Sequence, residues 1–126
     1  MMKNGTVWRD TDGSFIQAHG GCILEHAGIW YWYGENKASI TQNRRVDFLG
    51  FSCYCSTDLL RWENCGLVLP SITKPGHDLS PNAVCERPCV LYNPASKTFV
   101  MWFHQDNADY SRARAGVAVS QKPNGP

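Results

Sequence analysis

The sequence predicts an all-β protein made of two successive antiparallel sheets. Apolar and polar residues alternate with a period of two along most segments, as in strands that bury one face, and no stretch shows the 3.6-residue period of a long helix. A block of four such segments is followed by a block of three, with loops in corresponding places. Repeated units of about 40–50 residues that each form a four-stranded meander are typical of β-propeller blades.

The first unit is expected at about residues 17–69. A turn at 25–28 separates its first two strands, and Gly28 suits the positive φ that such a turn requires. The second strand is strongly aromatic, which favours β structure. The four strands are expected at residues 21–24, 29–34, 50–56 and 66–69.

The second unit is expected at about residues 84–126, after a crossing loop at 70–83 that is rich in Pro, Gly, Ser and Asn. Its strands are expected at residues 84–93, 98–104 and 116–120, so the outermost strand of a four-stranded blade is missing. Two blades cannot close a ring and leave apolar flanks uncovered, so the propeller interpretation implies further chain. A small β-sandwich is the competing architecture; it needs no further residues but does not explain the repeat.

The composition excludes several classes of protein. The 126 residues are 43% hydrophobic and 18% charged, with a formal net charge of +1, so there is no surplus of positive charge to bind nucleic acid. No apolar run approaches the ~20 residues of a membrane span, and the first residues lack the apolar core of a signal peptide. We therefore expect a globular domain without nucleic-acid or membrane partners; the compartment is not determined.

The six cysteines do not form a recognisable metal motif. Cys53 and Cys55 share one face of a strand, and Cys85 and Cys89 would lie about 13 Å apart in an extended strand, beyond the ~7 Å that a disulfide tolerates. The spacings also lack the usual zinc-knuckle pattern. Small buried core residues are the favoured interpretation. Residues 10–13 lack the ligand spacing of a calcium loop and are expected to form a turn.

Four blocks of sequence carry a family resemblance: residues 10–13 with 16–21, residues 31–35, residues 52–59 with Trp62, and residues 86–88 with 92–93 and 100–104. In this order they resemble glycoside hydrolase family 43, in particular its exo-β-1,3-galactanase and β-1,3-galactosidase branch. The resemblance runs from about Trp8 to Pro126. Cys22 and Cys89 depart from it, because the branch usually has glycine and lysine at those positions.

The resemblance implies that the chain is the N-terminal part of an incomplete five-bladed β-propeller whose active site lies at the funnel on its axis. It implies inverting hydrolysis, without a cofactor or metal, of terminal galactose from a galactan or arabinogalactan. The partners implied are this oligo- or polysaccharide and the missing C-terminal blades of the same propeller. A secreted protein is also implied, although the chain shows no signal peptide.

Glu86 is the principal site residue that the resemblance implies. It opens the innermost strand of the second unit and matches a glutamate that holds the sugar and tunes the pKa of the catalytic acid, since a nearby carboxylate raises the proton affinity of that acid. The acid itself is expected beyond residue 126. The alternative is that Glu86 merely pairs with Arg87, although adjacent strand residues point to opposite faces. Glu35 matches a ligand of sugar hydroxyls; a solvated glutamate at a strand end is its alternative.

Further contacts with substrate are implied for Gln17, His19 and Tyr110. Gln17 and His19 lie where the first blade reaches the funnel, near which many members of the wider family carry an aspartate base, but no Asp-Pro pair occurs here. The galactanase branch similarly lacks that aspartate, so the resemblance implies a general base from a later blade, outside this chain. Tyr110 matches a loop tyrosine that contacts substrate. The His77-Asp78 pair matches a feature of the branch or is simply a surface pair of the crossing loop. The mid-strand residues Trp30, Trp32 and Trp102 are expected to pack in the core rather than to stack on sugar.

Three functions therefore remain open. The first is part of a glycoside hydrolase, in which the isolated chain is inactive. The second is a non-catalytic carbohydrate-binding or degenerate propeller remnant. The third is an interaction module that pairs through an exposed strand edge.

Overall fold

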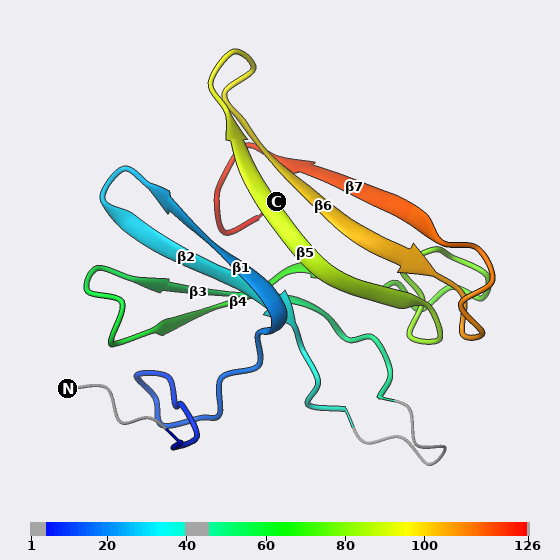
Figure 1. Cartoon of the computed structure of the whole chain (residues 1–126), viewed down its shortest axis with the longest axis horizontal. Coiled ribbons are helices and arrows are strands. Elements are labelled where there is room, and N and C mark those ends of the chain that lie inside the picture. The colour runs from blue at the N-terminus through cyan, green and yellow to red at the C-terminus, as the bar shows by residue number, and fades with distance from the viewer. Residues whose placement is uncertain (1–4, 40–45, 126) are drawn as a thin grey trace.

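The computed structural model describes residues 5–39 and 46–125, which form two antiparallel sheets (Figure 1). The first sheet has the order β1-β2-β3-β4 and the second the order β5-β6-β7. Within the described residues there is no helix, and so none with the length and apolarity to cross a bilayer. The strands are β1 (His19–His26), β2 (Ile29–Glu35), β3 (Gly50–Ser56), β4 (Glu63–Pro70), β5 (Val84–Asn93), β6 (Thr98–Asp106) and β7 (Arg114–Ser120). The prediction of an all-β fold in two successive sheets is confirmed.

The turn between β1 and β2 shows why the local sequence forms a hairpin. His26 pairs with Ile29, so only two residues connect the strands, and both have positive φ, 53° at Ala27 and 79° at Gly28. A two-residue turn of this kind matches the right-handed twist of the flanking strands. The Glu25 carboxylate accepts a 2.7 Å hydrogen bond from the Gly28 N–H and closes the turn.

The two sheets meet where β1 and β5 lie side by side near the middle of the molecule (Figure 1). The residues just before β1 pack closely against β2, and they can do so because position 34 in β2 is a glycine. A Cβ atom at Gly34 would lie 2.1 Å from the carbonyl carbon of Ala18, a distance that real Cβ atoms do not reach. Only glycine allows the two backbone segments to lie this close. The contact fixes the end of β2 against the start of β1.

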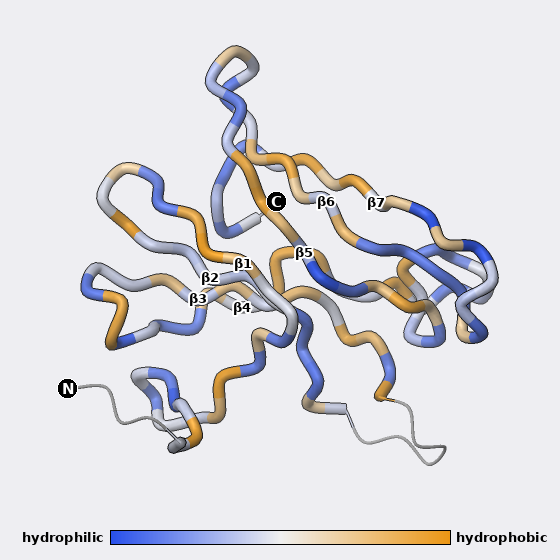
Figure 2. Tube along the Cα trace, viewed as in Figure 1, coloured by the Kyte–Doolittle hydropathy of each residue, from blue (hydrophilic) through white to orange (hydrophobic). Residues whose placement is uncertain are grey.

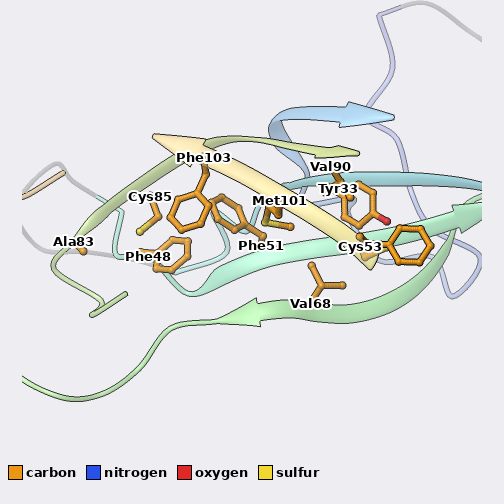
Figure 3. Close-up of a cluster of buried hydrophobic side chains, with 11 residues drawn as sticks. Tyr33, Phe48, Phe51, Cys53, Val68, Ala83, Cys85, Val90, Met101 and Phe103 are labelled. Carbon is orange, nitrogen blue, oxygen red and sulfur yellow. The ribbon is translucent and has the colours of Figure 1, made fainter. Parts of the chain in front are cut away.

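A single apolar core fills the space between the sheets. Phe51 and Cys53 of β3 are both fully buried, and they face Met101 and Phe103 of β6 (Figure 3). The Phe51 ring lies edge-on to Phe48 and to Phe103, with ring centroids 5.2 Å apart in each pair. Because both sheets supply side chains to this one cluster, the two sheet faces that meet share a single core.

The outer face of the second sheet is uncovered and apolar. Trp102 pairs with Val117 across β6 and β7, and the two side chains are each 49% exposed, while Val119 is 63% exposed. The prediction that Trp102 packs in the core is therefore wrong for this chain, because the alternation of β6 directs its neighbours Met101 and Phe103 inward instead. Trp30 and Trp32 are partly buried against Tyr54 and Trp62, as expected of packing residues.

All six cysteines are free thiols, and they differ in burial. Cys53 and Cys85 are buried core residues, as predicted, but Cys89 is exposed. A bulge between Glu86 and Cys89 shifts the register of β5, and Cys89 then pairs with Trp102 on the uncovered face. Among the residues that the structure describes, no group of three or more His, Cys, Asp or Glu side chains could hold a metal ion.

Candidate functional site

A cleft of about 380 Å³ lies between the end of β2, residues 46–48 and the start of β5. Three polar side chains that the resemblance singles out line it, namely Glu35, Glu86 and Tyr110. Figure 2 shows the corresponding hydrophilic stretch interrupting the otherwise apolar β5 close to where the sheets meet. The structure thus brings residues from positions 35, 86 and 110 to one surface hollow.

Glu86 is held from two directions. The Tyr110 hydroxyl donates a 2.6 Å hydrogen bond to Oε1, and Nδ1 of His104, the cross-strand partner of Glu86, lies 3.5 Å from Oε2. The next residue, Arg87, has a φ of 52° and forms part of the bulge, so the local strand is bent at the site. The Glu86 side chain remains 22% exposed, which leaves the carboxylate accessible from the cleft.

Asp106 supports this arrangement from behind. Its side chain is 1% exposed, and Oδ2 lies 3.1 Å from Nε2 of His104. Three backbone N–H groups of the loop 107–113 donate hydrogen bonds of 2.8–2.9 Å to the same carboxylate. Burial acts to raise the pKa of Asp106, but these hydrogen bonds outweigh it and hold the pKa below the usual value for aspartate. The ionised Asp106 therefore orders the loop that carries Tyr110.

Glu35 is the more buried carboxylate, at 6% exposed. Burial raises its pKa, the Lys37 ammonium 2.5 Å from Oε2 opposes this effect, and the charge of Glu86 adds to it. The effect of Glu86 on the pKa of Glu35 shows that the two carboxylates are close enough to interact across the cleft. Gly20 lies next to Oε1 of Glu35 and has a φ of 56°, in the left-handed region that favours glycine.

Gln17 and His19 lie beside the cleft rather than among the residues that line it. The Gln17 N–H donates to the Tyr54 hydroxyl at 3.0 Å, and its Oε1 accepts a 3.3 Å hydrogen bond from the Lys37 N–H, so Gln17 braces the segment after Glu35. His19 is exposed, pairs with Glu35 across the β1–β2 ladder and lines a neighbouring hollow with Trp8 and Trp32.

The crossing-loop pair His77-Asp78 lines a separate cleft of about 490 Å³. Asp78 forms a 2.6 Å ion pair with Arg114, and His77 Nδ1 accepts a 3.0 Å hydrogen bond from the Leu79 N–H. The Asp78 carbonyl also accepts a 3.0 Å hydrogen bond from Gln105. These contacts tie the crossing loop to the second sheet.

Three residues of the site were not singled out from the sequence, namely Lys37, His104 and Asp106. Lys37 follows Glu35 by two residues, a spacing that could have indicated an ion pair. His104 and Asp106 alternate at the end of a strand, which places both on one face, but their relation to Glu86 depends on the register. Only the pairing of β5 with β6 shows that His104 and Asp106 lie next to Glu86.

Several solved structures match almost the whole chain. A glycoside hydrolase family 43 β-1,3-galactosidase in complex with galactodeoxynojirimycin has 46% identity and a TM-score of 0.88 over 97% of this chain and 35% of its own. An exo-β-1,3-galactanase from Phanerochaete chrysosporium with galactose has 40% identity and a TM-score of 0.87 over 97% of this chain and 27% of its own. An exo-β-1,3-galactanase from Clostridium thermocellum has 44% identity and a TM-score of 0.84 over 98% of this chain and 25% of its own.

No protein-family profile matches the sequence, and no curated protein does. The strand order, the two-sheet arrangement and the 46% identity over an alignment that covers 97% of the chain nevertheless agree with the β fold of a glycoside hydrolase. The chain belongs to glycoside hydrolase family 43, and its matches are β-1,3-galactosidases and exo-β-1,3-galactanases. It spans about a quarter to a third of the length of these three enzymes.

Proposed function

We propose that this chain is part of a glycoside hydrolase that removes terminal β-linked galactose from galactan or arabinogalactan with inversion and without a cofactor. The observation that carries the proposal is the cleft in which Glu35, Glu86 and Tyr110 converge. Its support is the 40–46% identity to enzymes solved with galactose or galactodeoxynojirimycin. A variant of the Phanerochaete chrysosporium enzyme was also solved with β-1,3-galactotriose, at 40% identity to this chain.

The two carboxylates have different roles in this proposal. Glu86 accepts hydrogen bonds from sugar hydroxyls and, as an anion, raises the proton affinity of the catalytic acid so that the acid stays protonated at the working pH. Tyr110 and His104 hold its carboxylate in one orientation for both tasks. Glu35 accepts hydrogen bonds from further hydroxyls, because one carboxylate can receive two at once. Gln17 and His19, beside the cleft, contact parts of the substrate that extend past it on the first-sheet side.

The residues that transfer protons belong to the longer protein. Inverting hydrolysis requires an acid that protonates the leaving oxygen and a base that activates water on the opposite face, with carboxyl groups about 6.5–9.5 Å apart. We assign the acid to chain beyond residue 126 and the base to a later blade. On this proposal the 126-residue chain alone releases no galactose.

The architecture proposed is a five-bladed propeller of which residues 17–69 and 84–126 form two blades, the second without its outer strand. The uncovered face around Trp102, Val117 and Val119 supports it, since such an apolar surface suits the packing of a neighbouring blade. The convergence of β1 and β5 is also expected of innermost strands at the hub.

The test uses the complete enzyme that contains this chain and measures galactose release from β-1,3-galactobiose. We expect Glu86→Gln to lower kcat/KM by at least ~100-fold, because it removes a charge that acts on proton transfer. Glu25→Gln, in the exposed β1–β2 turn, is the matched control and should leave the rate unchanged. Near-normal activity of the Glu86→Gln enzyme would refute the assignment, and α-galactose as the first product, seen by NMR, would support inversion.

A further inference from the structure

The cleft of about 490 Å³ beside the crossing loop takes no part in the removal of galactose proposed above. One wall is the crossing loop, residues 73–78 and 80–83, and the other is the end of β6 with the loop that follows it, residues 105–108 and 112. Figure 1 shows these two loops side by side at one end of the second sheet. We call this hollow the crossing-loop cleft. Its volume is in the range of sites that hold a small ligand, roughly 300–1,000 Å³.

The crossing-loop cleft adjoins the galactose cleft, the hollow that Glu86 lines. Ala83 lines both clefts. The loop 107–113 also borders both, because it brings Tyr110 to the galactose cleft and Arg112 to the crossing-loop cleft. A substrate that places its terminal galactose beside Glu86 therefore has this second surface next to it.

The crossing-loop cleft carries two cations that no carboxylate neutralises. Lys74 and Arg112 line it and are exposed, and neither side chain forms an ion pair with the residues that the structure describes. The two carboxylates of the lining are already bound, because Asp78 pairs with Arg114 at 2.6 Å and the buried Asp106 accepts three backbone hydrogen bonds. The remaining positive charge favours a ligand with a negatively charged group.

Two neutral side chains of the same lining also have unused hydrogen-bonding atoms. His77 Nδ1 accepts the 3.0 Å hydrogen bond from the Leu79 N–H, which leaves the proton of the neutral ring on Nε2. Gln105 is 5% exposed, and its Nε2 donates to the carbonyl oxygens of Asp78 and Asp106 at 3.0 and 3.2 Å. Its buried Oε1 has no hydrogen-bond partner within the described part of the chain. An unpartnered buried oxygen is unfavourable, so this wall favours a ligand that brings hydroxyl groups.

We propose that the crossing-loop cleft binds a uronic acid of the polysaccharide, with the carboxylate held by the cations of Lys74 and Arg112. The hydroxyl groups of this sugar meet the hydrogen-bonding groups of His77 and Gln105. A uronic acid fits because it joins one carboxylate to several hydroxyls, whereas a neutral sugar makes no use of the two cations. The inference rests on the proposed hydrolase, and it extends the substrate from a neutral galactan to one with acidic substituents.

The first measurement is a calorimetric titration of the complete enzyme with methyl β-glucuronide, methyl β-glucoside and acetate. The two glycosides differ only in the carboxylate, and acetate supplies a carboxylate without a sugar. We expect the Kd of the glucuronide to be at least about 10-fold lower than that of either other probe. Absence of glucuronide binding, or an affinity no higher than that of the glucoside or of acetate, would overturn the proposal. This measurement requires neither turnover nor a variant.

Variants then locate the bound glucuronide. Lys74→Gln combined with Arg112→Gln should raise its Kd about 10-fold, because two exposed charge contacts are lost. Lys97→Gln is the matched control, since Lys97 is an exposed cation in the turn between β5 and β6, at the other end of the sheet, and it should leave the Kd unchanged. An unchanged Kd in the double variant would show that the glucuronide binds elsewhere.

The second measurement compares the initial rate of galactose release from an arabinogalactan that contains uronic acids with the rate from the same polymer after its carboxyl groups are reduced to alcohols. The unaltered enzyme should act about 5-fold faster on the acidic polymer, and the Lys74→Gln/Arg112→Gln enzyme should lose this preference. Salt at about 0.5 M should also weaken it, because screening reduces the attraction between exposed charges. Equal rates of the unaltered enzyme on both polymers would contradict the proposal. Release from β-1,3-galactobiose, which carries no acid, tests the hydrolase alone and so separates the two failures.

Discussion

Replacing Phe51 by Ala tests whether the two sheets share one core. Phe51 is fully buried on β3 and lies edge-on to Phe48 and Phe103, and Phe103 belongs to the second sheet. Removing a buried phenylalanine ring costs about 3–5 kcal/mol, and two aromatic pairs of about 0.5–1.5 kcal/mol each place this site in the upper half of that range. We therefore expect the free energy of unfolding to fall by about 4 kcal/mol.

The assay is urea unfolding of the chain followed by tryptophan fluorescence. With an m-value of about 2 kcal/mol/M, the expected change lowers the midpoint by about 2 M. Leu91→Ala is the matched control, because Leu91 is 58% exposed on the uncovered face and should change the stability by less than about 0.5 kcal/mol. If Phe51→Ala is too unstable to fold, Phe51→Leu provides a milder change. A loss below about 1 kcal/mol for Phe51→Ala would refute a core shared between the sheets.

Three further predictions concern the site and its supports, each measured by urea unfolding. The pKa of Asp106 is lowered in the folded protein, so its ionisation stabilises the fold above the unfolded pKa, and this contribution is lost as the pH falls through the folded pKa. Asp106→Asn should therefore destabilise the chain more at pH 7 than at pH 3. An equal loss of stability at both pH values would contradict this. The pKa of Glu35 is raised in the folded protein, so its contribution to stability is present at low pH and is lost as the pH rises through the folded pKa. Between pH 4 and pH 7 the Glu35→Gln variant should therefore gain stability relative to the unaltered chain. A difference in unfolding free energy that stays constant over this range would exclude the linkage. Gly34→Ala should lower the free energy of unfolding by more than about 2 kcal/mol, because the new Cβ would lie 2.1 Å from the carbonyl carbon of Ala18. An unchanged free energy of unfolding would show that the backbone can move apart there.

Most of the fold could be predicted from the sequence because polar and apolar residues alternate along most of its strands. The structure extends several strands beyond their expected bounds, most clearly β1, which runs from His19 to His26 instead of 21–24. The glycine-rich start of β1 gives no apolar alternation, so its pairing with β2 was not visible locally. The exposure of Trp102 was not predicted, because alternation shows that a strand has two faces but not which face is covered.

The site was only partly predictable, and the bulge in β5 explains why. An unbroken ladder from the pair Asn93 and Thr98 would place Arg87 opposite His104, whereas the shift places Glu86 there. A bulge adds one residue without a reliable sequence signal, so the contact between Glu86 and His104 follows from the structure alone. The same shift explains why Cys85 is buried but Cys89 exposed, since an unbroken strand would place residues four apart on the same face. The family resemblance indicated Glu35, Glu86 and Tyr110 as site residues. The strand register then showed that His104 is the partner of Glu86.

We propose that Glu35, Glu86 and Tyr110 form a galactose site. The most direct measurement is a crystal structure of the complete enzyme with bound galactose. We expect sugar hydroxyls within hydrogen-bond distance of both carboxylates and of the tyrosine hydroxyl. Galactose bound elsewhere, with Glu86 turned away from it, would show that these residues do not form the sugar site.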